Sequence, residues 1–364
     1  MTVVDSGLAH LSDGLFTTAI ATYALAMASY TAEYAFGRRG RVAVTSAVEE
    51  PVRVLVGAGG PPPPADDAVL AARSAPGGPF DQNRVEWSAE RAVEAAEPVE
   101  PTDRRASGER FGRFAVALTV LGALIHTASL AIRGIAVDRV PWGNMYEFSA
   151  LVGLIAVLAF LGALARAPQI RYLGVFVMLP VILVMFLAGT VLYAKAEPLV
   201  PALQSYWLAI HVSAAASAEG ILMTSAVITM LFLIRQRYDV QSKEPGRRIR
   251  FPVSLGARLP APATLDKVAY RTVAFAFPIY TFGVIAGAIW AEAAWGRYWG
   301  WDPKETWAFI AWVVYAAYLH ARATAGWKGR AAAWINLLGF GAMTFNFFVV
   351  NIVISGLHSY AGLN

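Results

Sequence analysis

The sequence predicts an all-α, polytopic membrane protein with about eight transmembrane helices and both termini on the outer face. Of its 364 residues, 57% are hydrophobic and only 15% are charged, with a mean hydropathy of +0.50. Soluble domains usually have about 25% charged residues. Apolar runs of roughly 20 residues, the length that crosses a bilayer, alternate along the chain with loops that hold the basic residues. The surplus apolar surface is therefore expected to face lipid.

Eight apolar runs are candidates for membrane crossings. They cover residues 15–36, 111–132, 148–165, 172–193, 206–234, 270–290, 305–321 and 331–354. If all eight cross the membrane, five groups of Arg and Lys residues, spread over four loops, fall on the same side, which the positive-inside rule makes cytoplasmic. The loops on the opposite side carry few basic residues. Both termini and a tryptophan-rich loop at residues 295–307 are then outside.

This topology divides the chain into three parts. Residues 1–37 hold an N-terminal transmembrane helix, residues 38–110 form a cytoplasmic insert, and residues 111–364 form a seven-helix membrane domain. The insert is rich in Pro, Gly and Ala and has few aromatic residues, so it can bury little surface and is expected to be disordered. We interpret it as a linker, since nothing in the sequence supports a docking role for its Pro-rich part.

Composition also excludes some chemistry. The chain has no cysteine, so it forms no disulfide and supplies no thiolate of its own. Its net charge of +5 comes from basic residues in loops beside apolar runs. That placement sets membrane topology and does not point to nucleic acid.

The external loop at residues 295–307 predicts a ligand site. It contains four tryptophans: Trp295, Trp299, Trp301 and Trp307. An indole offers a flat face and one N–H donor, which suits a planar, partly apolar ligand at the edge of a bilayer. Asp302 and Glu305 begin the next span. They either contact that ligand or form a capping box at the start of the helix, and the sequence leaves both interpretations open.

Two histidines are expected at the depth of this loop. His211 lies near the outer end of the fifth span, and His358 lies just past the outer end of the eighth. Imidazole is the usual protein ligand of haem iron, so the pair could bind a haem from both axial sides. Either histidine alone would more simply be explained by hydrogen bonds to local backbone groups. The pair together with the tryptophan loop favours haem.

The other histidines are expected elsewhere. His320 lies 13 residues after Trp307, so it is roughly 20 Å deeper at the rise of an α-helix and cannot share an iron with the outer pair. If it binds iron, its opposite ligand comes from another subunit or is not protein; otherwise it faces lipid phosphates. His126 is expected to be buried and hydrogen-bonded between helices. His10 is expected on the surface.

The tryptophan loop and the histidines together resemble a known protein family. Trp295, Trp299, Trp301, Asp302 and Glu305, at this spacing, resemble the WWD signature of haem-handling proteins in cytochrome c maturation. Residues 203–212 around His211, together with His320 and His358, are similar to the CcsA/ResC family, named CcsB in some bacteria. The segment 141–147 is similar as well. The resemblance covers the first span and nearly everything from residue 111 onward.

The resemblance implies a function. Members of the family work in System II, in the bacterial plasma membrane, with a ResB-type (Ccs1) partner. The complex, a holocytochrome c synthase, moves haem b to the outer face, where the WWD loop presents it for thioether attachment to the CxxCH motif of apocytochrome c. Matched residue by residue, His211 and His358 are the external axial ligands. His320 matches a transmembrane ligand whose counterpart lies on the partner. No residue is assigned a catalytic role.

Three other functions stay open. The first is haem delivery to a separate chaperone, as in System I. The second is transport of haem without a role in ligation. The third is a structural subunit of a respiratory complex whose tryptophans only anchor it at the interface, which predicts a colourless protein.

Overall fold

The computed structural model describes residues 4–36, 103–199, 201–324 and 326–358. The chain forms two units, residues 1–31 with 112–364, and residues 32–111. Of the second unit, only the end of one helix and the beginning of the next are described. The predicted disorder of residues 38–110 lies outside the described residues, except that residues 103–110 are already helical.

The described part of the chain contains eight long helices and no strand, which confirms the all-α prediction. They are α1 (Ser6–Phe36), α5 (Asp103–Val137), α6 (Met145–Arg166), α7 (Gly174–Thr190), α8 (Ser213–Gln241), α9 (Pro262–Trp295), α10 (Pro303–Ala323) and α11 (Arg330–Ile352). Each overlaps one of the eight predicted spans. Seven of the helices extend beyond their apolar run at one end or both, whereas α7 is shorter than its run.

Six of these helices are long and apolar enough to cross a membrane, so the protein is a multi-pass membrane protein. The other two are α1 and α10. Both are diluted by polar residues, such as Asp13 and Glu33 in α1 and Lys304, Glu305 and Arg322 in α10. The count of eight spans, and the outer position of both termini, therefore stay predictions.

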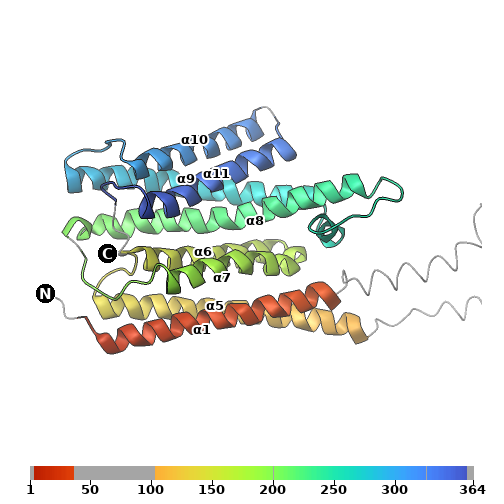
Figure 1. Ribbon diagram of the computed structural model, residues 1–364, viewed down its shortest axis with the longest axis horizontal. Coiled ribbons are helices and arrows are strands. Elements are labelled where there is room, and N and C mark those ends of the chain that lie inside the picture. Colours follow the sequence, from red (N-terminus) through yellow and green to blue (C-terminus); the bar gives the residue numbers. More distant parts are fainter. Residues whose placement is uncertain (1–3, 37–102, 200, 325, 359–364) are drawn as a thin grey trace, which may run out of the picture. The chain divides into compact units, whose positions relative to one another are not determined.

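Successive helices of the first unit run in opposite directions (Figure 1). The α9–α10 loop, the loop between α5 and α6, and the segment before α8 consequently lie at the same end of the helices. The first turns of α1 and the last turns of α11 are found there too. We call this end of the first unit the site end. It brings together segments that are far apart in the sequence.

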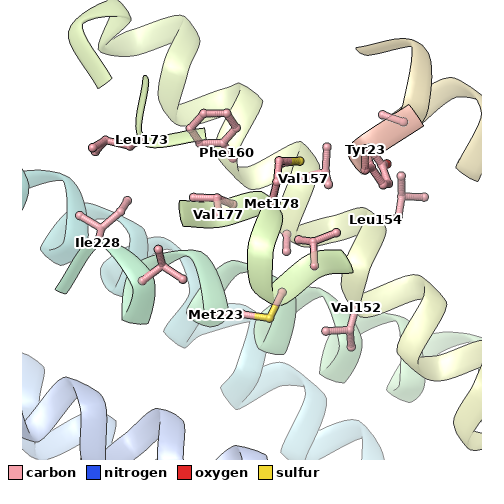
Figure 2. Close-up of a cluster of buried hydrophobic side chains, with 14 of the residues drawn as sticks. Tyr23, Val152, Leu154, Val157, Phe160, Leu173, Val177, Met178, Met223 and Ile228 are labelled. Carbon is pink, nitrogen blue, oxygen red and sulfur yellow. The ribbon is translucent and has the colours of Figure 1, made fainter. Parts of the chain in front are cut away.

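Helix α8 is the central element of the first unit. Of its most apolar stretch 72% is buried, against 28% for α9, and it packs against α6, α9 and α11. A helix that is apolar on all sides is expected at such a position. Its Met223 and Ile228 join side chains of α6 and α7, such as Phe160 and Met178, in the main core (Figure 2). The beginning of α8 is thereby fixed at the interior of the site end.

A buried ionic cluster holds the α5–α6 loop at the site end. The carboxylate of Glu147 accepts hydrogen bonds from Arg133 Nε (2.8 Å), Arg139 Nη1 (2.8 Å) and the Gly143 amide (2.8 Å). Arg133 also pairs with Asp13 of α1 (3.3 Å). Buried charges are tolerated only when they are paired in this way. The ion pairs of Glu147 could not be read from the sequence.

Candidate functional site

A cavity opens at the site end between α6, α8, α9, α10 and α11. Most of its wall is apolar or aromatic, with a few convergent polar groups, which is the usual composition of a ligand site. His211 and His358 both line it, and so do Trp295 and Trp299. Glu305 of α10 lines it as well, so the structure brings together five of the residues that the sequence singled out.

His211 is oriented by a backbone carbonyl. It lies in a π-helical turn, Leu208–Val212, that precedes α8; such turns are frequent at functional sites. Its Nδ1 is 2.8 Å from the carbonyl oxygen of Gly283 on α9. A carbonyl only accepts, so Nδ1 carries the proton and Nε2 keeps its lone pair. That is the tautomer a metal-binding imidazole needs.

Gly287 leaves room for this ring. A Cβ at this position of α9 would lie 2.6 Å from His211 Cε1, closer than real contacts allow. The absence of a side chain at Gly287 thus lets the imidazole lie flat against α9, beside Trp290 at a centroid distance of 5.8 Å. The glycine at position 287 and the packing against α9 thus agree with one position of the His211 ring.

His358 is oriented by a carboxylate. Its Nδ1 is 2.8 Å from Asp302 Oδ2, so this nitrogen donates and Nε2 again keeps its lone pair. Trp295 meets the imidazole edge-on at 4.9 Å. A carboxylate behind an imidazole fixes the ring and makes it a stronger ligand. Burial lowers the pKa of His358 below its ordinary value, although the hydrogen bond to Asp302 opposes this.

Asp302 has two structural tasks. It is the N-cap of α10, and with Glu305 it forms the predicted capping box. Its Oδ1 also accepts the Leu357 amide at 2.7 Å, which fastens the segment before His358. Burial opposes ionisation, but the hydrogen bonds from Leu357, His358 and the Lys304 amide hold the pKa of Asp302 below its ordinary value. Asp302 contacts His358 and is not part of the cavity wall.

The four tryptophans separate into two pairs. Trp295 and Trp299 line the cavity. Trp301 is 65% exposed and has a φ of +58°, a left-handed conformation that is strained for an indole-bearing residue. Trp307 lies against Phe345, with the ring centroids 4.1 Å apart and the rings tilted, and packs against the helix core. The structure thus places two of the four tryptophans in the cavity wall.

The remaining histidines lie away from this cavity. His320 is exposed on α10, and its imidazole faces outward from the first unit. His126 is fully buried, 3.5 Å from Tyr23 Oη and edge-on to Phe16, which confirms the predicted burial between helices. His10 is exposed on α1, as predicted.

Sequence reasoning missed two charged residues in the cavity wall, Glu219 and Lys304. Glu219 lies on the same face of α8 as His211, two turns or roughly 12 Å further along. An ionisable residue in an apolar span is by itself a reason to suspect function. Lys304 Nζ donates to Asn351 Oδ1 at 2.7 Å. Asn346 donates to the Lys304 carbonyl at 3.3 Å. Each of these bonds joins α11 to α10.

Comparison with known proteins places this site in a family. A family model described as Cytochrome C assembly protein matches residues 142–358, the stretch that contains every cavity residue named above. The cytochrome c biogenesis protein CcsA of Guillardia theta is 38% identical over 259 residues, which cover 68% of this chain and 85% of that protein. CcsA of Gloeobacter violaceus is 35% identical over 283 residues (65% and 83%), and CcsA of Pyropia yezoensis is 34% identical over 280 residues (69% and 88%). The chain belongs to the cytochrome c assembly protein family.

Proposed function

We propose that the protein acts in cytochrome c maturation by holding haem b at the outer face of the membrane and presenting it to apocytochrome c. The observation that carries the proposal is the pair His211 and His358, which line one cavity, each with Nδ1 engaged and Nε2 free to bind iron. Trp295 and Trp299 supply aromatic walls for a planar ligand. The cytochrome c biogenesis role in the names of its relatives agrees with this chemistry.

Thioether formation requires little of this chain beyond positioning the haem and the apocytochrome. In thioether formation each thiol of a CxxCH motif adds across a haem vinyl group, with sulfur bonding to one carbon and hydrogen to the other. Both thiols belong to the apocytochrome, so the absence of cysteine here is compatible with the reaction. The protein contributes orientation and proximity within a holocytochrome c synthase complex. The histidine of the apocytochrome motif then replaces one of the two axial imidazoles.

A membrane partner of the ResB type completes the proposal. His320 is exposed on α10 and lies roughly 20 Å from the loop along the helix axis, so a second ligand for an iron at that depth comes most simply from another chain. Haem would then pass from a site between the two proteins to the outer cavity. The WWD loop lies on the extracytoplasmic side of the plasma membrane in this arrangement.

The absorption spectrum of the purified full-length chain, with and without its partner, tests the outer site. We expect a low-spin bis-histidine haem spectrum, which His211→Ala or His358→Ala abolishes together with formation of c-type cytochromes. Added imidazole should partly restore both. The matched control is His10→Ala, which removes an exposed imidazole away from the cavity. Normal cytochrome maturation in either single variant would refute the ligand assignment, and a colourless protein would favour a structural subunit.

The second level of the pathway is tested separately. His320→Ala should lower the total haem in the complex purified with its partner, because haem enters through that histidine. The control is again His10→Ala. Haem content and spectrum unchanged by His320→Ala would exclude a transmembrane site at this residue and leave the outer site unaffected.

A further inference from the structure

The cavity has one polar region, formed by side chains of α8, α10 and α11. Among the described residues that line the cavity, Lys304 is the one basic side chain besides the two imidazoles. An ammonium group has three N–H donors, and Lys304 Nζ uses one of them, to Asn351 Oδ1 at 2.7 Å. A cation in an otherwise apolar wall is costly unless an anion accompanies it. The polar region is therefore suited to an anionic group.

Two asparagines of α11 hold this lysine in place. Asn351 accepts from Nζ and donates to the Phe347 carbonyl at 2.6 Å. Asn346 donates to the Lys304 carbonyl, and its own Oδ1 is buried without a partner among the described residues. The Lys304 amide donates to Asp302 Oδ2, the oxygen that also accepts from His358. The lysine is thus built into the same turn that orients one of the proposed axial ligands.

Glu219 is, with Glu305, one of the two acidic side chains among the described residues of the cavity wall. It attracts Lys304 electrostatically, but within the described ranges the two side chains form no contact short enough to be an ion pair. The carboxylate of Glu219 has no hydrogen bond there either. Glu219 therefore leaves two N–H donors of Lys304 available.

We propose that Lys304 binds a propionate carboxylate of the haem held between His211 and His358, and that Glu219 serves as its counterion when no haem is present. This inference rests on the proposed function and deepens it. A haem carries its two carboxylates on one edge and apolar substituents on the others. The cavity wall is likewise mostly apolar or aromatic, and Lys304 with Asn346 and Asn351 forms a polar region in it; Glu219, Glu305 and Asn144 are other polar residues of the wall. Lys304 thus fixes the rotation of the macrocycle about the axis between the imidazoles.

Titration of the haem-free full-length chain with two ligands tests the assignment. The ligands are haem b and its dimethyl ester, in which both propionates are neutral, and the readout is the bis-histidine absorption spectrum. The wild-type chain should bind haem b roughly tenfold more tightly than the ester, the difference expected for one charge-assisted hydrogen bond. Lys304→Met should weaken haem b binding about tenfold and abolish the difference, and Lys304→Arg should retain it.

Glu219→Gln should change the preference for haem b in the opposite direction to Lys304→Met. Removing the competing carboxylate should increase the preference for haem b over the ester. A purely structural pair of Lys304 and Glu219 predicts that both variants weaken the two ligands equally. The matched control is Lys195→Met, which removes an exposed lysine outside the cavity and should leave the preference unchanged.

The outcomes separate this inference from the proposed function. If the wild-type chain gives a bis-histidine spectrum with both ligands at equal affinity, the Lys304 assignment is wrong and the outer haem site stands. If neither ligand gives that spectrum, the haem site itself is refuted.

Discussion

The two cavity imidazoles differ in what accepts their Nδ1 proton. His211 donates to the neutral carbonyl of Gly283, whereas His358 donates to the carboxylate of Asp302. A carboxylate acceptor makes an imidazole the stronger electron donor to a metal. His358 is therefore expected to be the tighter of the two axial ligands, and His211 the one that a substrate histidine replaces.

Asp302→Asn separates the two tasks of Asp302. Asparagine is as good an N-cap as aspartate, so the free energy of unfolding should change by less than about 1 kcal/mol. Loss of the negative charge behind His358 should nevertheless weaken haem binding by roughly tenfold or more. A thermal unfolding curve and a haem titration on the same preparation measure both quantities. Equal haem affinity in variant and wild type would show that Asp302 serves the helix alone.

The sequence predicted those features of the site that depend on how deep a residue lies in the membrane. It did not predict those that depend on the direction in which a side chain points. His211 and His358 were paired because a membrane assigns each residue a depth. Trp301 is exposed and has a left-handed backbone, a local conformation that composition does not reveal. Trp307 points into the core because of its phase on α10. Lys304 was not singled out, because the basic residues of the outer loops were considered only as evidence for membrane topology.

At the scale of helices, the close contact between the start of α8 and α9 fixes the His211 ring. Gly287→Ala places a methyl group where the imidazole lies, 2.6 Å from Cε1. The ring should move away from Gly283, and the low-spin haem spectrum should be lost or strongly reduced. Gly341→Ala is the matched control, because a Cβ on that helical glycine meets open space. Both changes raise helix propensity by about 1 kcal/mol, so a difference between them reports the contact. An unchanged spectrum in Gly287→Ala would contradict the packing argument.

The ionic cluster below the α5–α6 loop is a second element-scale feature. Side chains of Glu147 and Arg133 are 0% and 2% exposed, so Glu147→Gln leaves buried arginines short of charge. Unfolding measured in detergent should show a loss of about 3–5 kcal/mol. Glu244→Gln, which breaks an exposed pair with Arg247, should cost no more than about 1 kcal/mol. Similar losses in the two variants would mean that the cluster adds no special stability to the cavity wall at Trp142 and Gly143.

For the whole molecule, the periodic alternation of apolar runs and basic loops predicted the order and direction of the helices, because each run needs the same length to cross the bilayer. The lateral arrangement could not be predicted. Nothing in the sequence states that α8 lies in the centre, since α6, α7 and α8 are all strongly apolar. Central burial of α8 is a property of packing, and it is what places His211 inside the cavity.

The membrane topology can be tested cleanly because the chain has no cysteine of its own. Single substitutions at exposed positions flank the two helices whose crossing stays a prediction: Ser6→Cys and Glu109→Cys for α1, and Tyr298→Cys and Lys328→Cys for α10. A membrane-impermeant maleimide should label the cysteines at 6 and 298 in intact cells. The cysteines at 109 and 328 should react only after permeabilisation, because the basic loops near them are retained in the cytoplasm. Labelling of both members of a pair from outside would show that the helix between them does not cross. The opposite pattern would place the tryptophan loop in the cytoplasm, where it could not present haem to an external apocytochrome.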